Sequence, residues 1–483
     1  MTGKSFFLKS GYAVRKKNRV APLMNGEEAW ASVYQELLKA KMTIHMCFWS
    51  IQAFHELLRP KADTYKSVAS RQKYTLLHVL DTMQSKGVTI RILIWNLNGF
   101  AMPDRGLILR GIWGKYQLIF QRYHMISKLY PGSWHQKTII VDDDLAFVGG
   151  MNAKELDWDT HDHAVFEQRR NPHKLSGSQR KQNQNNKSFP KFKPRRDFMA
   201  RIEGDAVKDV QSNFAERWNY CIKAKYSFSN RATRVAVKNA KSVSGMQTQI
   251  SRTMPKYKPT PKGKTEVWQS YIKAIGLAKK YIYIEDQYFR SNTIVQAVVN
   301  ACILNKKLVV IIVTPPTYLT KLKPGEKWKL AQSPATYWTH KSFKMIKAVR
   351  PNFVFYFLQT AYTKNSPKVL FQPIDIHSKI MIIDDLWYTI GSANVHDRGM
   401  FHDGELNVSV QNAASAKALR KKVFSNNLNV PCPDDLNKAI NLWTKHSRQN
   451  FLAWKQKKQP LSKIFPYNSV GPCLPYFPLV HWL

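Results

Sequence analysis

The sequence predicts an α/β protein built from two similar lobes. The stretch WHQKTIIVDDDLAFVGGMN in the first half recurs in the second half as IHSKIMIIDDLWYTIGSAN, with the same spacing of polar residues. Strand-like and helix-like segments alternate around both copies, which is typical of α/β architecture. The 483 residues, 44% of them hydrophobic, suffice for two sizeable cores.

The first lobe is expected over residues 1–235. A helix is predicted in NGEEAWASVYQELLKAK, with Asn25 as its cap and Glu27 near its positive end. The strand TIHMCFWSI follows it. A second helix over residues 71–86 ends at Gly87, and the strand VTIRILIW comes next.

The second lobe is expected over residues 236–483, after a connection in NRATRVAVKNAKSVSG. The strand GMQTQISRT opens this lobe, and a helix over residues 266–280 follows. The strands YIYIEDQYF and KLVVIIVTP then enclose a helix over residues 293–304, which completes a β-α-β unit. Beyond Asn412, two further helices form a C-terminal helical extension.

The chain is strongly basic, with a formal net charge of +43 and a pI near 10.0. Such a charge predicts attraction to polyanions, so an anionic phospholipid membrane surface is the expected partner and nucleic acid is the alternative. No obligate protein partner is evident. Residues 169–196 carry ten lysines and arginines and no acidic residue, which predicts a mobile or interaction loop.

The sequence contains neither a long apolar run of membrane-spanning length nor a classical signal peptide. We therefore expect a cytoplasmic or peripheral membrane protein, or one exported by a route without such a peptide. The five cysteines are widely scattered and lack zinc-site spacing, so they are expected to be reduced thiols.

The repeated stretch carries chemistry because its polar residues converge. Histidine and lysine two residues apart on a strand point to one face. Two imidazoles can then serve as nucleophile and proton donor, while lysines and asparagine amides stabilise phosphoryl oxygens. The predicted catalytic residues are His135, Lys137, Asp142, His377, Lys379 and Asp384, and the predicted phosphate ligands are Asn152, Asn394, Gly150 and Ser392.

Neither a metal nor another cofactor is required for this chemistry. Asp159, His161, Asp162 and His163 form a cluster of metal-ligand types, but the cluster lacks a complete ligand set, so no metal site is expected. Asp142 and Asp384 are expected to hold the motif lysine and the turn geometry.

These motifs resemble the signature of the phospholipase D superfamily, which is His-x-Lys, four residues, Asp, then six residues and Gly-Gly/Ser-x-Asn. Both copies match it at every defining position. LDWDTHDH and YIYIEDQYF further resemble segments of the true phospholipase D branch. The resemblance implies two lobes, each a mixed β-sheet flanked by helices, with the active site at their pseudo-two-fold interface, and suggests a bacterial source.

The resemblance also implies residue roles. His135 is expected to be the nucleophile, with His377 as acid and then base, although symmetry permits the reverse order. Asp197 is expected to orient a catalytic imidazole, and Glu405 is expected to lie behind the second histidine. The chain departs from the family pattern at Arg196, where histidine is common, and at Asp375, where tyrosine is usual.

The expected function is a phospholipase D that hydrolyses glycerophospholipids to phosphatidic acid and a free alcohol, with possible phosphatidyl transfer to other alcohols. The alternatives are a nuclease of the same superfamily, favoured by the basic charge, and a cardiolipin-synthase-like transferase. A non-catalytic lipid- or nucleic-acid-binding module is disfavoured, because a binding surface does not need two complete catalytic motifs.

Overall fold

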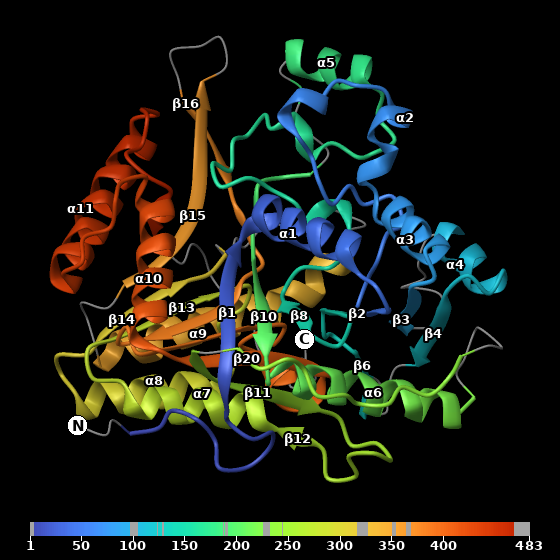
Figure 1. The fold of residues 1–483 in the computed structure, drawn as a ribbon. Coiled ribbons are helices and arrows are strands. Elements are labelled where there is room, and N and C mark those ends of the chain that lie inside the picture. Colours follow the sequence, from blue (N-terminus) through green and yellow to red (C-terminus); the bar gives the residue numbers. More distant parts are fainter. Residues whose placement is uncertain are drawn as a thin grey trace.

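The computed structural model describes residues 4–96, 105–122, 124–127, 130–186, 188, 192–225, 232–243, 245–315, 327–349, 354–363 and 369–467 (Figure 1). Its centre is a mixed sheet in which seven strands of one lobe continue into seven strands of the other. The first lobe contributes, in spatial order, β4 (Gln117–Arg122), β3 (Thr89–Asn96), β2 (Thr43–Phe48), β7 (Thr138–Val141), β8 (Leu145–Gly149), β10 (Phe198–Gly204) and β1 (Arg15–Met24).

The second lobe repeats this order. Its strands are β15 (Val354–Thr363), β14 (Val309–Val313), β13 (Tyr281–Asp286), β18 (Lys379–Ile383), β19 (Trp387–Gly391), β20 (Glu405–Gln411) and β11 (Met246–Met254). In each lobe the first three strands are parallel and the others are antiparallel. β1 pairs with β11 and joins the two halves, so the expected α/β fold of two similar lobes with mixed sheets is confirmed.

Helices flank both halves (Figure 1). They are α1 (Asn25–Lys39), α3 (Leu76–Ser85), α4 (Arg105–Ile112) and α6 (Val207–Lys223) in the first lobe, and α7 (Glu266–Leu277), α8 (Asn292–Leu304), α9 (Lys327–Val349) and α10 (Ala413–Leu428) in the second. The expected C-terminal extension comprises the end of α10, α11 (Leu436–Lys455) and β21 (Ile464–Pro466), which pairs with β15. Among the described residues, no helix has the length and apolarity needed to cross a bilayer.

Alternation along the strands divides side chains between separate cores. In β18, Ile380 and Ile382 pack into a core shared by both lobes, whereas Met381 and Ile383 pack into a core of the second lobe. The N-terminal segment also joins the halves, because Phe6 stacks on Trp387 at a centroid distance of 6.0 Å. The proposed boundary between residues 235 and 236 stays a prediction.

Two local expectations were wrong. Asn25 is not the helix cap: Met24 occupies that position, and Asn25 adopts a φ of 65° within the helix, with its amide directed at two histidine rings. The helix expected over residues 71–86 is interrupted. α2 (Val68–Arg71) ends before a short 3₁₀ turn, and α3 begins after Thr75, whose hydroxyl accepts from the N–H of His78.

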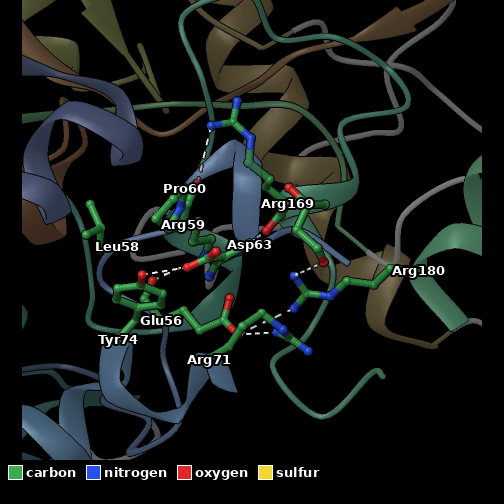
Figure 2. A pocket seen from close by; sticks show the side chains of 10 residues that line it. Glu56, Leu58, Arg59, Pro60, Asp63, Arg71, Tyr74, Arg169 and Arg180 are labelled. Atoms are coloured by element: carbon green, nitrogen blue, oxygen red, sulfur yellow. Dashed lines mark hydrogen bonds and ion pairs between the residues drawn. The ribbon is translucent and has the colours of Figure 1, made fainter. Parts of the chain in front are cut away.

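The basic segment 169–196 also differs from the expectation of a mobile or interaction loop. Its described part folds back on the first lobe and includes α5 (Gly177–Asn185), which begins with a capping box. Arg180 approaches Glu56 at 3.5 Å, and Arg71 forms an ion pair with the same carboxylate (Figure 2). Nδ1 of His173 lies 2.7 Å from that carboxylate. Burial alone would raise the pKa of Glu56, but His173 and the surrounding arginines lower it to about 2.

The motif aspartates accept hydrogen bonds from backbone N–H groups, whereas the motif lysines donate to the histidine carbonyls. The Asp142 carboxylate accepts from the backbone N–H groups of residues 41–43 at 2.7–2.9 Å. Asp384 accepts from those of residues 279–281 at 2.6–2.7 Å. Each aspartate thus fixes the start of a central strand, β2 or β13, against the turn that follows β7 or β18.

We expect Asp384→Asn to lower the free energy of unfolding by about 1–3 kcal/mol, because three backbone N–H groups at the start of β13 lose part of their acceptor. Asparagine tolerates the left-handed backbone at this position, where φ is 56°, so the substitution adds no backbone strain to the measured change in stability. Urea denaturation measures the change, and the exposed Asp162→Asn is the control. Equal stability of the two variants would contradict the structural role.

Candidate active site

Both motif histidines are positioned by equivalent backbone pairings between the lobes. Trp134 and Gly404 form a parallel bridge, and His135 follows it with its N–H donating to the Gly404 carbonyl at 2.8 Å. On the other side, β17 (Asp375–Ile376) pairs in parallel with β9 (Arg195–Arg196), and the N–H of His377 donates to the Arg196 carbonyl at 2.8 Å. In both cases the opposite lobe continues from the bridge into an acidic residue: Glu405 follows Gly404, and Asp197 follows Arg196.

Glu405 is the acid that pairs with His135. Its Oε1 lies 2.9 Å from Nδ1 of His135, and the Ser392 hydroxyl donates to the other carboxylate oxygen. The expectation that Glu405 lies behind the second histidine is therefore wrong. The reason is the parallel bridge, which brings the start of β20 beside the first histidine.

Asp197 is the acid that pairs with His377, with 2.6 Å between Oδ2 and Nδ1. Gly150 leaves room for this carboxylate, because a Cβ at that position would lie 2.4 Å from Oδ1 of Asp197. Gly150 and Ser392 thus occupy equivalent places, each against one carboxylate. Their expected contact with phosphate stays a prediction.

The two departures from the family pattern form ion pairs across the lobes. Arg195 contacts Asp375 on the paired strand, and its Nε lies 2.9 Å from Asp157. Arg196 is fully buried and lies 3.0 Å from Glu285 of β13. These contacts hold β9 against β17, so they maintain the approach of Asp197 to His377.

The motif lysines lie at the same place in each half. Lys137 Nζ donates to the carbonyl of His135, and Lys379 Nζ donates to the carbonyl of His377. Lys379 also reaches Gln287 Oε1 at 3.4 Å. Burial and the neighbouring Lys379 lower the pKa of Lys137 to about 7, despite the opposing effect of Glu405.

The two motif asparagines are held differently. The side-chain amide of Asn152 donates to Asp157 at 3.1 Å, and its oxygen accepts from the N–H of Ser50 at 3.2 Å. The Oδ1 of Asn394 is buried and has no partner among the residues that the structure describes. The two motifs match in sequence, but the side chain of Asn152 is fixed by hydrogen bonds at both ends, whereas that of Asn394 is less constrained.

Burial and positive charge favour neutral imidazoles in this site. Burial, followed by Lys137 and Lys379, holds the pKa of His135 well below its ordinary value. Burial, followed by Arg195 and Lys379, has the same effect on the pKa of His377. Because Nδ1 of each ring faces a carboxylate, Nε2 is the nitrogen available to a substrate. An electrophile with negative charge matches these neutral nucleophiles and buried ammonium groups.

The acidic and histidine cluster at residues 159–163 is filled by protein contacts. Asp159 lies 2.9 Å from His163 Nδ1 and 3.0 Å from Arg170, and it accepts from the N–H of Arg195. Its charge is therefore satisfied by the Arg170 cation and by hydrogen-bond donors. Within the described part of the chain, no group of three or more metal-ligand residues converges.

The roles of Asp157, Arg195 and Gln287 were missed from the sequence. Asp157 lies in LDWDTHDH and Gln287 in YIYIEDQYF, two segments already singled out by resemblance, so the signal for them was present. Arg195 gave no such signal, because it sits in a run of basic residues whose contacts depend on the other lobe.

Two family models match adjoining parts of the chain. The model described as "Phospholipase D" matches residues 118–309, and the model described as "Cardiolipin synthase, PLD-like domain" matches residues 271–426. Together they cover both motifs.

Phospholipases D from three organisms are similar in sequence. Phospholipase D1 of Saccharomyces cerevisiae is 22% identical over 80% of this chain and 26% of its own length. Phospholipase D beta 2 of Arabidopsis thaliana is 24% identical over 77% of this chain and 52% of its own. Phospholipase D A of Dictyostelium discoideum is 24% identical over 79% of this chain and 32% of its own length.

The chain thus spans between about a quarter and about half of these relatives. All three come from eukaryotes, so they give the expected bacterial source no support.

A solved structure shares the whole fold. Phosphatidylserine synthase of Haemophilus influenzae Rd KW20 aligns with a TM-score of 0.50 and 12% identity, over 93% of this chain and 97% of that one. At this identity the likeness concerns the fold. With both motifs complete, both family models matched and the double-lobed fold shared, the chain belongs to the phospholipase D superfamily.

Proposed function

We propose that this protein is a phospholipase D, which hydrolyses the distal phosphodiester bond of glycerophospholipids to phosphatidic acid and a free alcohol. The observation that carries the proposal is the pair of histidines at one interface, each oriented by a carboxylate of the opposite lobe. The names of the relatives support a phospholipid substrate.

In the first step, Nε2 of His135 attacks phosphorus and the bond from phosphorus to the head-group oxygen breaks. His377 gives its Nε2 proton to the departing alcohol. Lys137, Lys379, Asn152 and Asn394 stabilise the phosphoryl oxygens as charge develops on them. The product of this step is a phosphatidyl group bound to His135 and a neutral His377.

In the second step, His377 takes a proton from water, and the resulting oxygen nucleophile attacks phosphorus. The phosphorus–nitrogen bond breaks, which restores His135 and releases phosphatidic acid. An alcohol in place of water gives phosphatidyl transfer. His377 then carries the proton needed for the next first step, so protons balance over the cycle.

The electrostatics of the free site suit this order. A neutral His135 has the lone pair required for attack. A bound phosphodiester brings a negative charge that opposes the effect of the lysines, so it raises the pKa of His377 and favours the protonated acid. The basic surface then serves to recruit the protein to an anionic phospholipid membrane.

Product analysis tests the reaction. We expect mixed phospholipid vesicles with EDTA and ethanol to yield phosphatidic acid and phosphatidylethanol, detected by mass spectrometry. His135→Ala and His377→Ala should each lower the yield by about 10²–10⁴-fold, since each removes an acid–base or nucleophilic group. DNA cleavage without lipid products would identify a nuclease instead, and cardiolipin formation a transferase.

A substrate with a good leaving group distinguishes the roles of the two histidines. Because p-nitrophenolate departs without a proton, His377→Ala should release about one equivalent of it from phosphatidyl-p-nitrophenol and accumulate an adduct on His135. His135→Ala should give no burst. Stopped-flow absorbance and peptide mass spectrometry measure these outcomes. An adduct on His377 in the His135 variant would reverse the assignment.

The crossed carboxylates predict a pH effect. Asp197→Asn removes the negative charge beside His377, so the pKa of this imidazole falls further and the protonated acid is lost at lower pH. The alkaline limb of kcat/KM should move to lower pH, and the maximum rate should fall about 10²-fold or more. Glu203→Gln in β10, the strand that begins directly after Asp197, is the control. An unmoved limb in Asp197→Asn would contradict the pairing.

A further inference from the structure

The end of α11 and the turn after it, residues 451–461, combine exposed apolar side chains with lysines. We call this segment the α11 tip. Leu452, Trp454 and Leu461 are 55, 47 and 50% exposed, and it is the grouping of three such side chains in one short segment that points to an interaction surface. Within the tip, the rings of Phe451 and Trp454 lie 6.0 Å apart. These groups gather at one end of the extension rather than along a buried stripe.

The charged side chains of the α11 tip are all positive. Lys455, Lys457 and Lys458 are exposed, and the sequence after Asp435 contains no aspartate or glutamate. Lys455 Nζ lies 4.6 Å from the ring centroid of Phe451, so cationic and aromatic groups share one surface. Tryptophan with lysine suits the boundary between lipid head groups and acyl chains.

We propose that the α11 tip docks on an anionic lipid bilayer, with Leu452, Trp454 and Leu461 at the acyl boundary and the three lysines among the phosphates. This inference rests on the proposed function, and it deepens that function by naming the surface that meets the substrate membrane. Charge complementarity selects the occupant, since lysines without neighbouring acids favour anionic lipid.

The α11 tip is tied to the strand that leads to the active site. The Lys457 carbonyl accepts from the N–H of Val369 at 2.9 Å, at the start of β16 (Val369–Pro373). β16 leads directly into β17 and then into His377. Figure 1 shows α11 and α10 beside the long hairpin of β15 and β16. A bilayer held by the tip therefore has a defined position relative to one catalytic histidine.

A second exposed apolar site provides a matched control. Ile112 and Trp113 at the end of α4 are 61 and 56% exposed, and Arg110 lies near the Trp113 ring. This arginine is paired with Asp81 at 2.6 Å, so its charge is offset. In Figure 1, α4 and α11 lie on opposite sides of the view, so the two exposed apolar groups belong to separate surfaces.

The test is cosedimentation of the full chain with vesicles of phosphatidylcholine alone or of equimolar phosphatidylcholine and phosphatidylglycerol. An apolar variant carries Leu452→Ser, Trp454→Ser and Leu461→Ser, and a charge variant carries Lys455→Gln, Lys457→Gln and Lys458→Gln. The charge variant should bind the anionic vesicles about 100-fold more weakly than the parent, because each lysine near a charged bilayer contributes a several-fold factor. The apolar variant should also bind more weakly by about 100-fold, because it no longer buries three large apolar side chains at the acyl boundary. Ile112→Ser with Trp113→Ser should bind like the parent.

Wild-type binding by both tip variants, or loss of binding in the α4 variant, would overturn the proposal. Loss in the charge variant alone would also overturn it, because a purely electrostatic patch does not require the apolar residues. Unchanged melting temperatures verify that these exposed substitutions leave the fold intact.

Activity separates this inference from the proposed function. On a monomeric short-chain phosphatidylcholine, the tip variants should turn over at the parent rate, whereas on anionic vesicles their rate should fall with binding. If the parent hydrolyses neither lipid but binds vesicles through the tip, the proposed function fails and the docking surface stands. Equal loss of activity on monomers and vesicles would place the tip in catalysis and overturn the docking role.

Discussion

The crossed histidine–carboxylate pairs are the constraint on which the rest of the site depends. Each imidazole is useful only if Nδ1 is held and Nε2 is presented, and the acid that holds it belongs to the other lobe. The pairing requires two parallel backbone bridges, a glycine or serine beneath each carboxylate, and a common sheet through β1 and β11. The candidate active site is therefore formed by the interface between the lobes.

Buried charge gives that interface its chemistry. Two lysines, two histidines and two acids are withdrawn from water, and such a set is stable only when each member has a partner of suitable sign or a backbone acceptor. The ion pairs of Arg195 and Arg196 extend this balance around His377. Burial lowers the pKa values of His135 and His377, which leaves neutral imidazoles beside the motif lysines.

Much of the fold could be predicted from the repeated spacing and the alternation of strands and helices. The repeat predicts the roles of the histidines, lysines and asparagines directly, because that prediction needs only local spacing on a strand. The partner of Glu405 could not be predicted, since it depends on which lobe the start of β20 meets. The segment 169–196 was misjudged for a similar reason: Arg180 is buried against Glu56, which is distant in sequence.

The crossing of the pairs has an evolutionary consequence. A single ancestral lobe with one histidine and one acid could not have oriented its own imidazole, so it would have worked as an obligate homodimer. Fusion into one chain removes the concentration dependence of that assembly, because the second lobe is always present at a high effective concentration. Two halves within one chain are also free to differ, and Asn152 and Asn394 have different surroundings although their motifs match.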